Sequence, residues 1–122
     1  MPFNHVVVWI DHSKAHVLHF NPTVVEAEML KAHHTRHHLS TGEHLDVETR
    51  HYFDDIAAAL KDVPEILVVG PGQEKLLFTK YLKQHHPLVS QNILGIETVD
   101  HPTDGQLLAY ARKFFRKADL MH

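Results

Sequence analysis

The stretch VVVWI at residues 6–10 is an unbroken run of β-branched and aromatic residues. It is too short for a helix of this composition, and its continuous apolar character is typical of a central strand buried on both faces. Residues 11–14 form a polar break of hairpin length. In residues 15–20, successive side chains would point to opposite faces of an extended chain, which predicts a second strand that returns antiparallel to the first.

A third strand is expected after the turn signal at Asn21-Pro22. Within residues 24–32, one face would carry apolar side chains and the other would carry Glu26 and Glu28. This alternation predicts a half-exposed strand at the edge of the sheet. The apolar positions are Val25, Ala27 and Met29.

Residues 33–47 have no usable period and predict a long polar loop that is rich in histidine. Loops of this length in compact domains are usually functional or disordered. From residue 47 onward the period becomes helical, and two short apolar strands then alternate with two further helices. The expected ranges are a helix from about 47 to Pro64, a strand at 65–69, a helix at 73–85, a strand at 92–99 and a final helix after 103.

The resulting order is βββαβαβα. Each strand–helix–strand unit implies a right-handed crossover between parallel strands. We therefore predict an α/β fold with a five-stranded mixed sheet, the element order of the ribonuclease H-like architecture. No linker or internal repeat divides residues 1–122, so a single domain is expected.

Composition narrows the function classes. The 122 residues are 43% hydrophobic and 22% charged, and they contain no cysteine, which excludes thiol catalysis and Cys-ligated zinc. No apolar run is long enough to span a membrane, so we expect a soluble cytoplasmic protein. The formal net charge of -3 argues mildly against nucleic-acid binding. However, 14 histidines would carry that charge to -3 + 14 = +11 if all were protonated.

The histidine-rich segment is a candidate metal site. His33/His37 and His34/His38 are spaced i, i+4 and would share a helical face, and imidazole suits zinc, nickel and copper. A solvated loop with pH-tuned positive charge is the alternative, since no fixed ligand spacing such as His-Glu-x-x-His is present. No cofactor is predicted, although adventitious binding of Zn or Ni is expected.

Carboxylates and glycines give weaker indications of a functional site. Asp11, Asp100 and Asp104 follow predicted strands, as the metal-binding acids of a nuclease would, but a mid-strand carboxylate is missing. Asp11 also suits a hairpin turn, and Asp100 also suits an ordinary loop before a helix. Gly70-Pro71-Gly72 resembles an anion-binding turn, but no Lys-Ser/Thr follows it, which favours a tight strand–helix connection.

The final helix predicts a basic face opposite its apolar stripe. Four cations there are balanced by a single acid, Asp119, and this excess suits RNA or an acidic partner. A solvated face near a helix C-terminus is the alternative. The cations are Arg112, Lys113, Arg116 and Lys117.

Two segments carry a resemblance to a known family. Residues 8–17 (VWIDHSKAHV) and 66–78 (ILVVGPGQEKLLF) resemble the opening hairpin and the Gly-Pro-Gly strand–helix unit of one domain. That domain is the middle domain of eukaryotic and archaeal class-1 peptide-chain release factors and of Pelota. Small bacterial single-domain relatives look closest, including at residues 95–102 and 104–107. The resemblance runs nearly end to end in matching element order.

This resemblance implies a role in translation. In release factors, the loop after the third strand carries a Gly-Gly-Gln motif that promotes peptidyl-tRNA hydrolysis. The corresponding residues 33–44 here contain one glycine and no glutamine. We therefore expect a non-catalytic protein that associates with the ribosome, tRNA or rRNA, with a transition-metal-binding protein as the alternative. The expected RNA-contacting residues are Arg36, His37, His38, Arg112, Lys113, Arg116 and Lys117. A homodimer is also expected from the exposed edge strand.

Overall fold

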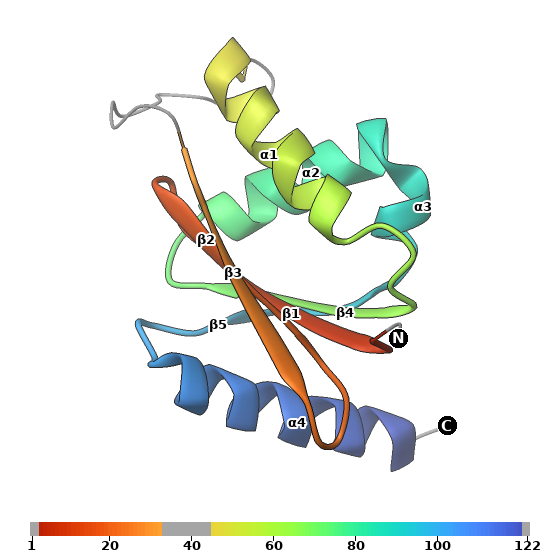
Figure 1. Ribbon diagram of the computed structural model, residues 1–122. Coiled ribbons are helices and arrows are strands. Elements are labelled where there is room, and N and C mark those ends of the chain that lie inside the picture. The colour runs from red at the N-terminus through yellow and green to blue at the C-terminus, as the bar shows by residue number, and fades with distance from the viewer. Residues whose placement is uncertain (1–2, 33–44, 121–122) are drawn as a thin grey trace.

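The protein was analysed as a computed structural model, which describes residues 3–32 and 45–120 (Figure 1). Its elements follow the predicted order, with one short additional helix. They are β1 (His5–Ile10), β2 (Lys14–Phe20), β3 (Val25–Lys31), α1 (Val47–Ala59), β4 (Glu65–Gly70), α2 (Glu74–His85), α3 (Pro87–Ser90), β5 (Ile93–Thr98) and α4 (Asp104–Leu120).

The five strands form one mixed sheet in the order β3-β2-β1-β4-β5. The meander β1–β2–β3 is antiparallel, whereas β1 pairs with β4, and β4 with β5, in parallel. The predicted α/β fold and the edge position of the third strand are both confirmed. The VVVWI run occupies the centre, and each of its side chains is 3% exposed or less.

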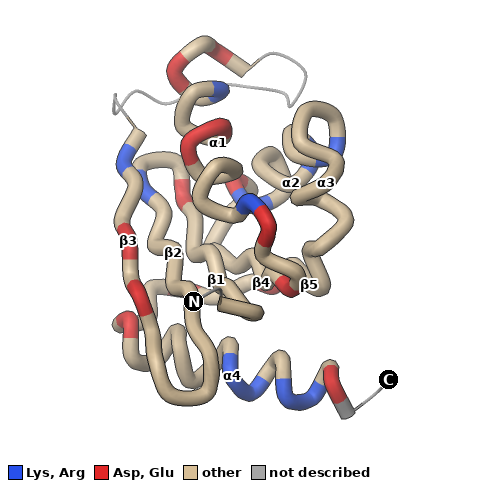
Figure 2. The backbone as a smooth tube through the Cα atoms, turned by 45° about the vertical axis from the view of Figure 1, so that its right-hand side comes forward, with Lys and Arg blue, Asp and Glu red and all other residues tan. Residues whose placement is uncertain are grey.

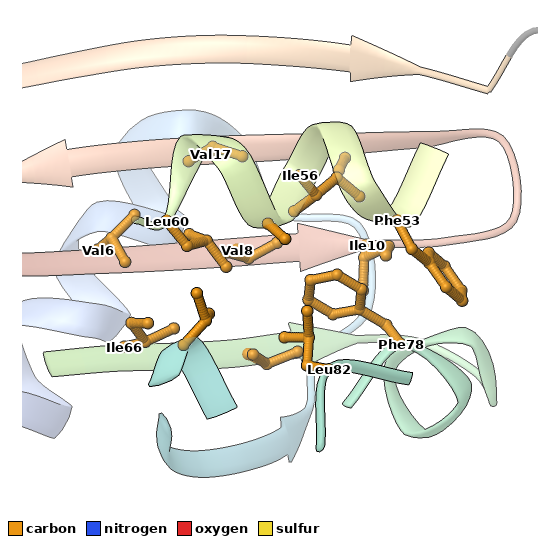
Figure 3. Close-up of a cluster of buried hydrophobic side chains, with 14 of the residues drawn as sticks. Val6, Val8, Ile10, Val17, Phe53, Ile56, Leu60, Ile66, Phe78 and Leu82 are labelled. Atoms are coloured by element: carbon orange, nitrogen blue, oxygen red, sulfur yellow. The ribbon is translucent and has the colours of Figure 1, made fainter. Parts of the chain in front are cut away.

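Helices cover both faces of the sheet and create two apolar cores. The larger core lies beneath α1 and α2, and Figure 3 shows Val6 and Val8 of β1 packing there against Ile56 and Leu60 of α1. The smaller core lies above α4, which covers the opposite face alone (Figure 1). The alternation of side chains along β1 sends Trp9 to the α4 side.

Local hydrogen bonds explain where the elements begin. The Asp11 carboxylate accepts from the backbone N–H groups of Ser13 and Lys14, which sets the β1–β2 turn. At the start of α4, the backbone N–H of Thr103 donates to the Gln106 side chain at 2.9 Å and the backbone N–H of Gln106 donates to the Thr103 hydroxyl at 3.1 Å, which forms a capping box. No helix in the described ranges is long and apolar enough to cross a lipid bilayer.

The prediction that β3 is half-buried is wrong. Val25 and Met29 are 43% and 49% exposed, and Glu26 and Glu28 on the other face are exposed as well. The α4-side core takes residues from β1, β2 and β4 but none from β3, so the helix does not reach this edge. On the other face, packing begins with Leu30.

Candidate nucleic-acid interface

The predicted basic face is present on α4. Burial of Leu107, Ala111 and Phe115 against the sheet fixes the rotation of the helix. That rotation leaves Lys113, Arg116 and Lys117 exposed. Figure 2 shows the cationic stretches along this outlying helix.

Arg112 is half-buried and differs from the other three cations. Its Nη2 atom donates a hydrogen bond to the Asn21 backbone oxygen at 2.9 Å, and its guanidinium lies 5.7 Å from the centroid of the Phe20 ring. These contacts tie α4 to the β2–β3 turn. Arg112 therefore contributes charge to the face but also packs as a structural residue.

A cleft of about 320 Å³ adjoins the basic face, where α4 meets the β2–β3 turn. Arg112, Arg116 and Asp119 line it together with apolar and ring-bearing residues. The two guanidinium groups in this lining are of the kind that binds phosphate, although the Asp119 carboxylate lies in the same lining.

One cluster of potential metal ligands lies at the rim of the same cleft. The ligating atoms of His5, Glu65 and Asp119 are all within 4.8 Å of one another. His5 Nε2 is 2.7 Å from a Glu65 carboxylate oxygen, and its ring packs against Phe115 at 4.5 Å between centroids. These contacts show that His5 is a packed residue, and the arginines of the cleft disfavour a cation there.

His33, His34, Arg36, His37 and His38 of the histidine-rich segment lie outside the described residues. The metal site and the loop contacts to RNA remain predictions from the sequence. What the structure places is the base of the segment, between the end of β3 and the start of α1 at Val47.

Polar side chains gather where β1 and β4 end, on the α1–α2 side of the sheet. The Tyr52 hydroxyl donates to the Asp11 backbone oxygen at 3.0 Å, and Glu74 and Lys75 at the start of α2 are 7% and 6% exposed. Burial, together with the nearby charge of Asp11, raises the pKa of Glu74 to about 7. Although burial alone would raise the pKa of Asp11, its turn hydrogen bonds lower it.

The Gly70-Pro71-Gly72 turn connects β4 to α2. A Cβ atom at Gly70 would lie 2.3 Å from the Ile10 carbonyl oxygen, so the backbone there passes too close for any side chain. Lys75 Nζ donates to the Gly72 carbonyl oxygen, and Glu74 occupies the first turn of α2. A buried carboxyl group in that position disfavours a bound anion, which supports the interpretation as a tight strand–helix connection.

The carboxylates considered for a nuclease have separate partners. Asp11 sets the hairpin turn and Asp100 pairs with His101 at 2.8 Å, which match ordinary turn and loop roles. Asp104, at the start of α4, lies 3.2 Å from His16 of β2.

Sequence reasoning missed Glu74, Lys75 and the Trp9 indole, which donates to the Asp100 backbone oxygen. A signal for Glu74 was present, because it lies four residues before Phe78 and eight before Leu82, on the buried stripe of α2. For Trp9, by contrast, the sequence holds no local signal, since its partner lies 91 residues away.

Several solved structures contain a domain with a similar fold. Archaeoglobus fulgidus Pelota matches 93% of the chain with a TM-score of 0.66 and 18% identity. The archaeal translation termination factor aRF1 matches 88% with a TM-score of 0.62 and 12% identity. S. cerevisiae Dom34, a termination-like factor involved in RNA quality control that interacts with Hbs1, matches 87% with a TM-score of 0.59 and 12% identity.

These likenesses establish a release-factor-like and Pelota-like domain fold. The chain spans about a third of the length of each protein, 31–32% of the matched chains. No protein-family model and no curated protein sequence matches it.

Proposed function

We propose that this domain binds the ribosome or other structured RNA as a non-catalytic component of translation. The observation that carries the proposal is the exposed trio Lys113, Arg116 and Lys117 on the outward side of α4. The fold adds support, because aRF1 is a termination factor and Dom34 acts in RNA quality control.

The charge distribution favours a localised contact. With a formal net charge of -3, the protein as a whole does not attract polyanions at neutral pH. Binding would therefore depend on α4 and on the adjoining cleft with its two arginines. Contacts from Lys and Arg to phosphates are independent of base sequence, and each one strengthens the dependence of affinity on salt.

The non-catalytic part of the proposal is based on the sequence. The chain contains no Gly-Gly-Gln, and residues 33–44 include a single glycine and no glutamine. Purified protein should therefore leave peptidyl-tRNA intact. Robust hydrolysis by the wild-type protein would contradict this part, whatever the outcome of the binding experiments.

Replacing Lys113, Arg116 and Lys117 together by alanine should weaken ribosome co-sedimentation and RNA affinity at every pH. The slope of log affinity against log salt should become shallower by about 0.7–0.9 for each phosphate that the variant no longer neutralises. Arg112 is kept because its removal would also disrupt packing on Phe20. The matched control replaces Lys61, Lys80 and Lys83, which are exposed on other elements and carry the same total charge. Equal reductions in affinity in both triple variants would refute a specific role for α4.

Replacing His33, His34, His37 and His38 by alanine should mainly flatten the pH dependence of RNA binding. Unperturbed imidazoles gain charge between about pH 8 and 6, so wild-type affinity should rise across that interval. Titrations at fixed salt, at several pH values, would measure this. An affinity of the wild type that is indifferent to both pH and salt would remove the electrostatic basis of the proposal.

A further inference from the structure

Among the residues that the structure describes, the outer edge of β3 is unpaired along its whole length. β3 is the terminal strand of the sheet, and within residues 3–32 and 45–120 no other strand pairs with its outer side. All but one of its seven residues are exposed. Figure 1 shows β3 as the orange strand at the edge of the sheet. An ordered strand with unpaired backbone groups is a template for pairing with another extended segment.

The register shows which backbone groups are available. Asn21 N donates to Val24 O at 3.0 Å and Ala32 N donates to Ser13 O at 2.9 Å. In an antiparallel pair the hydrogen-bonded positions alternate, so the even-numbered residues of β3 bond to β2. The N–H and C=O groups of Val25, Ala27 and Met29 therefore point outward and are open to a partner.

The side chains at this edge differ between the two faces. Val25, Ala27 and Met29 lie on the α4 side, because their partners across the sheet include Leu18 and Phe20 of the α4-side core. Glu26 and Glu28 lie on the α1–α2 side, and the acidic stretches along β3 are red in Figure 2. A strand added here would meet apolar groups on one face and carboxylates on the other.

We propose that the β3 edge binds an extended protein segment in which apolar and basic residues alternate. The apolar residues would pack beside Val25 and Met29, which are 43% and 49% exposed. The basic residues would stand opposite Glu26 and Glu28, at the positions between hydrogen-bonded pairs where side chains approach most closely. This surface is separate from the cations of α4, so the proposal does not depend on RNA binding.

A second copy of this chain fits the central registers of this edge poorly. Two β3 strands paired antiparallel about a two-fold axis at Glu26, Ala27 or Glu28 would place a glutamate opposite a glutamate in each case. Like charges directly opposite one another destabilise a pair of strands. RNA is disfavoured by the same carboxylates. A homodimer through β3, which is expected from the sequence, is therefore the alternative that the following experiment must distinguish from peptide binding.

The test uses amide hydrogen exchange, followed by NMR on the full chain, with a short synthetic peptide of alternating valine and lysine. Binding should slow exchange at Val25, Ala27 and Met29, with little change at Glu26 and Glu28, whose amides already bond to β2. A peptide of alternating valine and glutamate is the matched control. Equal binding of both peptides, or slowed exchange elsewhere only, would overturn the proposal.

Two variants separate the backbone and charge contributions. Ala27→Pro removes an outward N–H without removing a hydrogen bond to β2, so the fold should persist while peptide binding falls about tenfold or more. The double variant Glu26→Lys and Glu28→Lys should weaken binding of the valine–lysine peptide by at least the same factor. Asp55→Lys, an exposed change on α1, should have little effect. Protection of Val25, Ala27 and Met29 in the free protein, by a second copy or by residues 33–44, would also refute the proposal.

Discussion

Replacing Gly70 by alanine is expected to destabilise the protein by about 3 kcal/mol or more. The added Cβ atom would lie 2.3 Å from the Ile10 carbonyl oxygen, well inside any real contact. That oxygen belongs to the backbone of the central strand, so relief requires β1 and β4 to separate. Thermal unfolding should show a fall in Tm of about 10 °C or more.

Gly72→Ala provides a closely matched control. It makes the same chemical change two residues away, where no atom lies within 4 Å of the added group. Its Tm should remain close to that of the wild type. Equal Tm values for the two variants would contradict the explanation that the close approach of β4 to β1 requires glycine at position 70.

The sequence was most informative where the physical cause is local. The run at residues 6–10 predicts a central strand because all five side chains are apolar, and both faces of β1 are indeed buried. The capping box of Thr103 and Gln106 is another local feature, because it depends on only four consecutive residues. In each case the chain carries the whole signal within one element.

The errors arise where the outcome depends on another element. The alternation in β3 predicted burial of one face, but burial requires α4 to extend beneath it, and the helix packs on β1, β2 and β4 instead. Similarly, the spacing of Arg112 placed it on the basic face, whereas its hydrogen bond to Asn21, 91 residues away, makes it half-buried. Three of the four predicted cations of α4 are freely exposed, and the predicted contacts at Arg36, His37 and His38 lie outside the described residues.

Glu74→Gln should stabilise the protein at pH 8 and have little effect at pH 5. The ordinary pKa of this carboxyl is 4.5, and burial with the nearby charge of Asp11 raises it to about 7 in the folded protein. Between these values the folded protein holds a proton that the unfolded chain has released. The free energy of unfolding of the wild type therefore falls as pH rises from 4.5 to 7, by about 2–3 kcal/mol in total.

Glutamine resembles the protonated carboxyl in shape and cannot ionise. The free energy of unfolding of the variant should therefore not fall in this way as pH rises. Urea denaturation of both proteins across pH 5–8 would measure the difference between their free energies of unfolding. Because both proteins contain the same histidines, the contribution of histidine titration largely cancels from this difference. Glu48→Gln, at an exposed position in the first turn of α1, should show no gain between pH 5 and 8. A Glu74→Gln effect that stayed constant over this range would mean that Glu74 is already ionised in the folded protein at pH 5. The carboxyl end of β1 and β4 would then tolerate two adjacent negative charges, Asp11 and Glu74.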